Sequence, residues 1–223
     1  MNTIGNLRER PVRRLVQLLA GLLLYGVSMA LMIESTLGLD PWDVFHQGLA
    51  RLTGLSFGTI TIAVGALVLL LWIPLRQRPG IGTISNVVLI GLAVDATLAL
   101  LPTVQPWPLR VGFLAAGIVL NGVATGLYIG ARLGPGPRDG LMTGYVALHP
   151  RHSVRLVRTV IEISVLATGW LLGGTVGFGT VLYAVSIGPL VQLFLPLFTV
   201  PGGGAPPTAD AAARTAVSPA AGS

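Results

Sequence analysis

Long apolar runs separated by short polar segments extend over most of the chain. A helix needs about 20 apolar residues to cross the hydrocarbon core of a bilayer. The last two runs belong to one uncharged stretch, Ile163–Ala209, which is too long for a single helix and is interrupted by the sequence GGTVGFG. The pattern predicts an all-α, polytopic membrane protein with six transmembrane helices, and a five-span arrangement is the alternative. The predicted spans cover residues 14–35, 56–75, 82–101, 110–131, 155–173 and 178–199.

Composition supports the membrane class. Only 10% of the 223 residues are charged, against about 25% in soluble domains, and the mean hydropathy is +0.79. The chain has no cysteine, which excludes disulfides, thiolate metal sites and cysteine nucleophiles. Its three histidines are scattered, so we expect neither a metal site nor a cofactor.

The arginines predict an orientation in the membrane. Residues 1–13 form a basic N-terminal segment, and the run Leu15–Ile33 is long enough to be an uncleaved first span rather than a signal peptide. With the N-terminus inside, twelve of the fourteen basic residues fall on the inner side, and only Arg51 and Arg110 fall outside. This bias predicts a cytoplasmic N-terminus in a bacterial cytoplasmic membrane. Residues 201–223, rich in Pro, Gly and Ala, are expected to form a disordered tail.

The two halves of the chain repeat each other. Residues 18–48 and 114–144 align without gaps and are identical at 13 of 31 positions. A second match follows at a slightly larger offset, where Gly80–Thr83 corresponds to Gly177–Thr180. The repeat divides the chain into two three-helix units, 14–101 and 110–199. An odd number of spans in each unit would insert the two units in opposite orientations, as in many secondary transporters.

Each unit contains a motif that predicts the start of a short helix: GLDPWDVFHQG at 38–48 and GPGPRDGLMTG at 134–144. Asp40 is a favourable N-cap residue, and Pro41 and Pro137 suit the first helical position. The predicted helices, about 41–52 and 137–148, are too short to span, so we expect them to be re-entrant or interfacial.

The acidic residue of each motif has two interpretations. Asp43 and Asp139 fall in the first helical turn, where a carboxylate stabilises the positive end of the helix dipole. Alternatively, two half-helices meet from opposite faces and form a substrate or gating site. Trp42 is expected to anchor the chain at the membrane interface, its counterpart Arg138 makes the two faces unequal, and His46 is expected to be a solvated loop residue.

Ionisable residues inside predicted spans are further candidates, because charge at membrane depth is costly. Glu34 lies at the outer end of the first span and is also explained as an interfacial carboxylate. Asp95 lies in the third span and is a candidate for substrate binding or proton coupling. Arg158 and Glu162 are four residues apart in the fifth span, where they could form a structural ion pair.

Several motifs in order carry a family resemblance: LGLDPWDVFHQGL, GIGTISNVVLIGLAVD, LGPGPRDGLMTGY, VRTVIE and GWLLGGTVGFGTV. Over residues 14–198 the chain resembles the YczE-like bacterial integral membrane proteins, which are similar to the broader YczE/YyaS/YitT group. The resemblance implies a multi-pass protein of the cytoplasmic membrane and supplies no catalytic residues. It supports as site candidates Pro41, Asp43, Pro137, Arg138, Asp139, Arg158 and Glu162.

The leading functional hypothesis is a transporter of a small solute or ion, or a subunit of one. The alternative is a non-transporting membrane protein that assembles or stabilises a partner complex. We expect no enzymatic activity, because no nucleophile and base form a recognisable set. The expected partners are the lipid bilayer and a small-molecule or ion substrate, not nucleic acid; a homo-oligomer or a membrane partner protein is also compatible with the sequence. The candidate residues for substrate binding or coupling are Glu34, Asp43, Asp95, Arg138, Asp139, Arg158 and Glu162.

Overall fold

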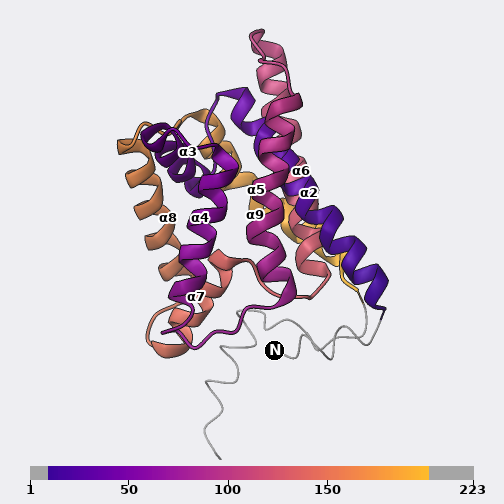
Figure 1. Ribbon diagram of the computed structural model, residues 1–223, viewed down its shortest axis with the longest axis vertical. Coiled ribbons are helices and arrows are strands. Elements are labelled where there is room, and N and C mark those ends of the chain that lie inside the picture. Colours follow the sequence, from indigo (N-terminus) through magenta and orange to yellow (C-terminus); the bar gives the residue numbers. More distant parts are fainter. Residues whose placement is uncertain (1–9, 201–223) are drawn as a thin grey trace, which may run out of the picture.

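The computed structural model describes residues 10–200 and shows eight helices and no strand within that range (Figure 1). Most of the predicted basic N-terminal segment and the whole predicted disordered tail lie outside the described residues. The helices are α2 (Pro11–Ser35), α3 (Pro41–Thr53), α4 (Phe57–Leu71), α5 (Ile81–Leu100), α6 (Trp107–Gly130), α7 (Pro137–Leu148), α8 (Val154–Leu171) and α9 (Phe178–Phe198).

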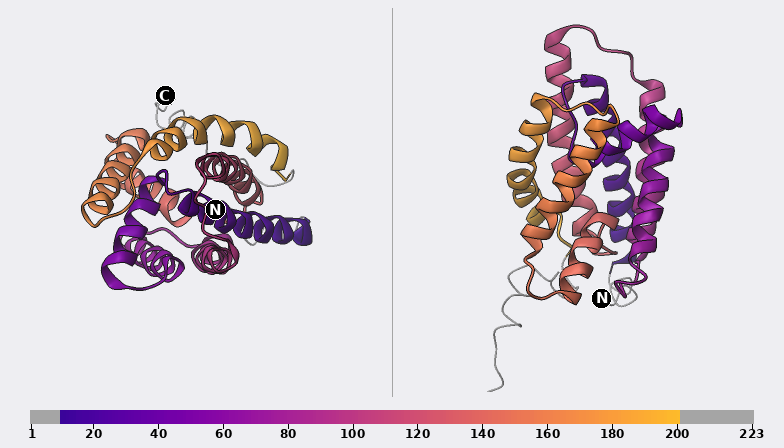
Figure 2. Two further views of the ribbon diagram at one scale, coloured as in Figure 1. Left: turned by 90° about the horizontal axis from the view of Figure 1, so that it is seen from above. Right: turned by 90° about the vertical axis from the view of Figure 1, so that its left-hand side faces the viewer.

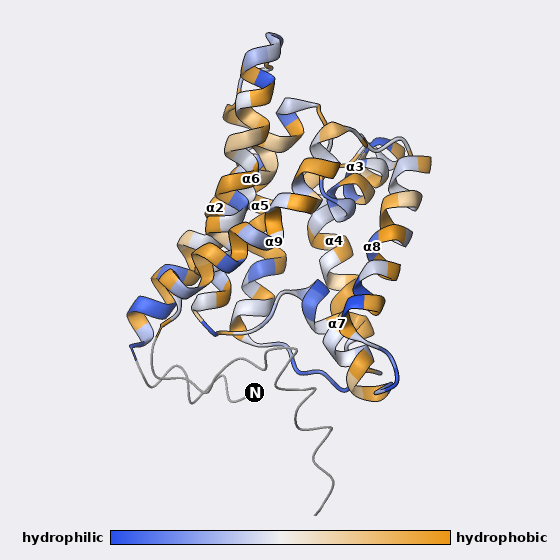
Figure 3. Ribbon diagram, turned by 180° about the vertical axis from the view of Figure 1, so that it is seen from behind, coloured by the Kyte–Doolittle hydropathy of each residue, from blue (hydrophilic) through white to orange (hydrophobic). Residues whose placement is uncertain are grey.

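The predicted all-helical architecture is confirmed, and each apolar run forms a helix close to its predicted bounds. Four helices, α2, α5, α6 and α9, are long and apolar enough to cross a membrane. The helix α4 has only 15 residues, but α3 and α4 together, bent by 114°, would make a fifth span. The helix α8 carries three charged residues in its 18. The six-span count therefore stays a prediction. Apolar residues extend along the sides of the long helices in Figure 3.

The centre of the fold is the pair α2 and α6, with α5 packed against α2 and α9 packed against α6 (Figure 2). Small residues allow the central helices to approach closely. A Cβ atom added to Gly21 would lie 2.8 Å from the backbone nitrogen of Tyr128, and one added to Gly117 would lie 2.6 Å from the Met32 side chain. Glycine is thus required at both positions for this close helix packing.

Two arginines connect the ends of the central helices. Arg14, near the start of α2, donates a hydrogen bond to the carbonyl oxygen of Ala131 at 3.0 Å. Arg110, near the start of α6, donates to the carbonyl oxygen of Ser35 at 2.8 Å. The last carbonyls of a helix have no partner within it, so each central helix supplies a donor to the end of the other. The repeat relates the two contacts: Arg110 lies 96 residues after Arg14, and Ser35 lies 96 residues before Ala131.

The connections after the central helices also form equivalent contacts. The backbone N–H of Gly179 donates to Leu37 at 2.8 Å, and that of Gly82 donates to Leu133 at 3.0 Å. Just after each acceptor lies a glycine with positive φ, 122° at Gly38 and 141° at Gly134. These φ values strain other residues, so both turns depend on glycine. The sequence repeat thus has matching backbone contacts in both halves.

The short helices lie near opposite ends of the molecule, with α3 above and α7 below in Figure 1. The helix α3 packs against α8, and α7 packs against α4. Each short helix therefore contacts a long helix from the other half of the chain. This exchange brings the starts of α3 and α7 towards the middle of the molecule, where the candidate site lies.

Candidate functional site

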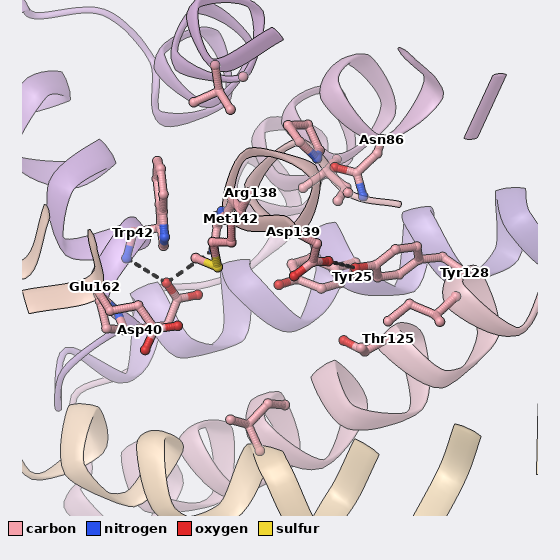
Figure 4. A pocket seen from close by; sticks show the side chains of 18 of the residues that line it. Tyr25, Asp40, Trp42, Asn86, Thr125, Tyr128, Arg138, Asp139, Met142 and Glu162 are labelled. Carbon is pink, nitrogen blue, oxygen red and sulfur yellow. Dashed lines mark hydrogen bonds and ion pairs between the residues drawn. The ribbon is translucent and has the colours of Figure 1, made fainter. Parts of the chain in front are cut away.

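A cavity of about 370 Å³ lies between the starts of α3 and α7. Every helix of the described chain contributes to its walls, and the first residues of the two short helices, Pro41 and Pro137, both line it. Figure 4 shows polar side chains of α2, α3, α6 and α7 gathered around this space. The cavity therefore joins the two sequence motifs, which are 96 residues apart.

The two helix starts differ in how they are capped. The carboxylate of Asp40 accepts hydrogen bonds from the backbone N–H groups of Trp42 at 2.8 Å and Asp43 at 3.0 Å, which confirms the predicted N-cap. At the start of α7 the equivalent residue is Gly136, which offers no capping side chain. Asp139 in its first turn accepts a long hydrogen bond, 3.4 Å, from the Tyr128 hydroxyl group.

Arg138 connects the two motifs across the cavity. Its guanidinium nitrogens lie 3.5 Å from an Asp40 oxygen and 3.6 Å from an Asp43 oxygen. The same group lies over the Trp42 ring at 5.1 Å from its centroid, which is a cation–π distance. One positive charge from α7 thus faces two buried carboxylates at the start of α3. An interaction of this kind is strong where water is excluded.

Three polar atoms around Arg138 have no hydrogen-bond partner among the described residues. They are Oδ2 of Asp40, Oδ2 of Asp43 and Nε1 of Trp42, and all three are buried. Buried polar atoms in proteins are nearly always hydrogen-bonded, and exceptions often mark a missing ligand, water or ion. Asp40 and Trp42 line the cavity directly, whereas Asp43 does not, so the free atoms of Asp40 and Trp42 are the ones nearest to a molecule bound in it.

Two expectations for the first motif are wrong. Trp42 is only 5% exposed and His46 only 2% exposed, so the first is not an interfacial anchor and the second is not a solvated loop residue. The reason is that α3 lies against α4 and α8, which cover its sides. The His46 ring nitrogen Nδ1 lies 3.3 Å from the Asp43 carboxylate, and His46 also lines the cavity.

The charged pair predicted in the fifth span is present. Arg158 Nε donates to Glu162 at 2.8 Å on α8, and both residues line the cavity. The Arg158 side chain is 56% exposed, so solvent screens this pair more than it screens Arg138. The described residues contain no group of three or more histidines and carboxylates that could hold a metal ion.

Three candidates are not part of the cavity lining: Asp43, which contacts Arg138, and Glu34 and Asp95, which lie away from the cavity. Glu34, near the end of α2, is not part of its lining. Asp95 on α5 accepts hydrogen bonds from the Ser56 hydroxyl group at 2.5 Å and from the backbone N–H of Gly58 at 2.7 Å. It therefore caps the start of α4 from the neighbouring helix.

Replacing Asp95 by alanine is expected to lower the free energy of unfolding by about 1–2 kcal/mol, the usual effect of removing a helix cap. Asp95→Asn should cost less, because its amide oxygen still accepts a hydrogen bond. Denaturant titration in mixed micelles would measure both variants. A loss below about 0.5 kcal/mol in the alanine variant would show that Asp95 does not stabilise α4.

The two outer helix pairs differ in how closely they pack. Along the α4–α5 seam, made by Ser56, Gly58, Gly91 and Asp95, a Cβ atom at Gly91 would lie 2.6 Å from the Gly58 carbonyl oxygen. Gly188 on α9 corresponds to Gly91, 97 residues later, and a Cβ atom there would have no atom of the described chain within 4 Å. Gly188 and Gln192 line the cavity and are exposed. The cavity thus opens along the α8–α9 seam, made by Arg158, Gly188 and Gln192.

Sequence reasoning missed part of the cavity wall. Tyr183 on α9 lines it and donates a hydrogen bond to Asn121 at 3.1 Å. The repeat offset of 97 pairs Tyr183 with Asn86, which also lines the cavity. Asn86 is a polar residue within a predicted span, so a search at the equivalent position of the second half would have found Tyr183.

Comparison with known proteins gives the family. The model of a family of unknown function, DUF6198, matches residues 12–196. The chain belongs to this family. Two relatives of the DUF6198 chain are an uncharacterized protein of Haemophilus influenzae, 42% identical over 178 residues (80% of this chain and 81% of the relative), and the uncharacterized membrane protein YczE of Bacillus subtilis, 35% identical over 192 residues (85% and 89%).

A third relative, the uncharacterized protein YyaS of Bacillus subtilis, is 24% identical over 181 residues, which are 79% of this chain and 90% of the relative. The resemblance to YczE-like proteins is thereby confirmed. Together with the long apolar helices it identifies this DUF6198 chain as a membrane protein. No solved structure matches it.

Proposed function

We propose that this protein is a secondary transporter of a small solute, which binds in the cavity between α3 and α7. The observation that carries the proposal is the meeting of two short-helix starts, one from each repeat, at a cavity with buried and unpartnered polar atoms. Transporters built from inverted repeats bind substrates at such a place, near the middle of the membrane and at the ends of broken helices.

The proposed topology has six spans in two inverted units, with the N-terminus in the cytoplasm of a bacterium. The arginine distribution supports this orientation. Arg110 is one of only two basic residues on the predicted outer side, and it has a structural role there, since it donates to Ser35 at the end of α2. The equivalent contacts at offsets of 96 and 97 residues support the division into two units.

The difference between the two seams supports alternating access. In the proposed orientation, the tight α4–α5 seam closes the outer half of the molecule, and the cavity reaches the inner half along the α8–α9 seam. Because the two units are related by the repeat, closing the α8–α9 seam and opening the α4–α5 seam would give the outward-facing state. Rocking of one repeat against the other is the usual form of this exchange.

Cysteine labelling in proteoliposomes tests the proposal, because the chain contains no cysteine of its own. Thr125 lines the cavity, and Thr125→Cys is a small change. We expect a membrane-impermeant methanethiosulfonate reagent to modify it from either face of the membrane, because the cavity opens to each face in turn. Two exposed loop positions, Leu55→Cys and Arg151→Cys, serve as markers of the two membrane faces. Each should react from one face only, and the two faces should be opposite.

The outcomes separate the proposal from its rival. Labelling of Thr125→Cys from one face only would contradict alternating access. If Thr125→Cys is labelled from one face only and a membrane partner co-purifies with the protein in stoichiometric amount, the assembly role would be favoured. Labelling of Leu55→Cys and Arg151→Cys from the same face would contradict the inverted arrangement itself.

A further inference from the structure

We propose that the solute bound between α3 and α7 is a small organic ammonium ion that donates hydrogen bonds to Asp40 and is attracted by the combined negative charge of Asp40 and Asp43. That this ion is a transported substrate rests on the proposed function, whereas its binding depends only on the residues of the cavity. Its basis is an excess of buried carboxylates over positive charges, together with oxygen atoms that have no donor.

The charges around the cavity do not balance. The lining contains the carboxylates of Asp40, Asp139 and Glu162, and its only arginines are Arg138 and Arg158. A fourth carboxylate, Asp43, lies next to the lining and contacts Arg138. Arg158 forms an ion pair with Glu162. Arg138 alone therefore faces Asp40 and Asp43, and burying an uncompensated carboxylate is costly. A bound cation would supply the missing positive charge.

The free atoms indicate what kind of cation fits. Arg138 faces Oδ1 of Asp40 and Oδ1 of Asp43, and the two Oδ2 atoms are buried with no hydrogen-bond partner among the described residues. A charged N–H donor satisfies a carboxylate oxygen better than a neutral donor does. A primary ammonium group carries three N–H donors, as lysine does, so one such group can donate to Asp40 and still has donors for other polar groups of the lining.

The walls favour an organic ion over a metal ion. The cavity volume, about 370 Å³, greatly exceeds the roughly 30 Å³ that one water molecule occupies. Tyr25, Tyr128 and Tyr183 contribute aromatic rings to the lining, and such rings attract organic cations and pack against alkyl groups. No metal-type cluster of histidines and carboxylates is found in residues 10–200.

The cavity is less suited to an anion. The start of α7 has no capping side chain, which alone would attract an anion, but three carboxylates line the same space and Asp43 lies next to it. The Asp139 carboxylate lies within the first turn of that helix and occupies the region where an anion would bind. The net charge of the cluster decides in favour of a cation.

Calorimetric titration of the purified protein in detergent tests this inference, with ethylammonium chloride as the probe. We expect saturable binding of ethylammonium, weaker binding of tetramethylammonium, which has no N–H donor, and no competition by sodium or acetate ions. Asp40→Asn keeps a side chain that can cap α3 and removes the charge, so it should weaken ethylammonium binding about 10- to 100-fold. Asp43→Asn should act in the same direction.

Asp95→Asn is the matched control, since Asp95 lies outside the cavity lining and binds Ser56 and Gly58 rather than Arg138. The affinity of this variant for ethylammonium should stay within about twofold, a difference of about 0.4 kcal/mol. Equal binding of tetramethylammonium, or displacement by sodium ions, would overturn the inference. So would unchanged affinity in both Asp40→Asn and Asp43→Asn. If ethylammonium does not bind but Thr125→Cys is labelled from both faces, the transporter proposal stands and the substrate belongs to another class. If ethylammonium binds but Thr125→Cys is labelled from one face only, the binding inference stands and the transporter proposal is overturned.

Discussion

A bridge between Ser56→Cys and Asp95→Cys is expected to restrict access to the cavity to one face of the membrane. In the structure the Ser56 hydroxyl group donates to the Asp95 carboxylate at 2.5 Å, so a disulfide or a short bifunctional thiol reagent can join these positions. The bridge would hold α4 against α5 and prevent the proposed outer half from opening. Because the bridge consumes both thiols, a third cysteine, Thr125→Cys, stays available as the reporter of access.

The measurement is the rate of modification of Thr125→Cys by an impermeant reagent added to each face of proteoliposomes. On the face served by the α8–α9 seam the rate should be unchanged. On the opposite face it should fall about 100-fold, which corresponds to about 2.7 kcal/mol, and a reductant should restore it. Variants that carry Thr125→Cys with only one of Ser56→Cys and Asp95→Cys cannot form the bridge, so the same oxidant treatment of these variants shows whether the oxidant itself changes the labelling rate. Equal labelling from both faces with the bridge in place would show that the α4–α5 seam is not the gate.

Much of the architecture follows from local sequence signals. The helices α3 and α7 start at the residues that Pro41 and Pro137 predict, because proline fits the first helical turn and cannot continue a helix interior. The ion pair of Arg158 and Glu162 follows from helical spacing alone. These features depend only on neighbours within a few residues, so a sequence pattern contains them.

The arrangement of the site depends instead on contacts between distant segments. Trp42 and His46 look like surface residues in sequence, and they are buried because α4 and α8 cover α3. Asp95 looks like a charge inside a span, and its carboxylate caps α4 because Gly58 and Gly91 bring the two helices together. The repeat predicts that the two motifs are related, but only the packing shows that Arg138 reaches Asp40 and Asp43.

The role of Arg138 leads to the second large effect. Arg138→Gln should lower the free energy of unfolding by about 3 kcal/mol, because it leaves Asp40 and Asp43 buried without their positive partner. Arg158→Gln is the matched control: it removes an arginine from the same cavity, but its exposed pair with Glu162 should be worth less than about 1 kcal/mol. Denaturant titration in mixed micelles would compare the two variants.

A double-mutant cycle separates the charge interaction from a general packing defect. If Arg138 stabilises the fold by compensating the two carboxylates, then the effect of Asp43→Asn on stability should be more favourable by about 1–2 kcal/mol in the Arg138→Gln variant than in the parent protein. Coupling energies of this size are typical of residues in direct contact. Additive losses would mean that Arg138 acts through its packing on Trp42 instead. A strong coupling would also strengthen the ligand inference, because it would show that the cluster is sensitive to the number of positive charges it holds.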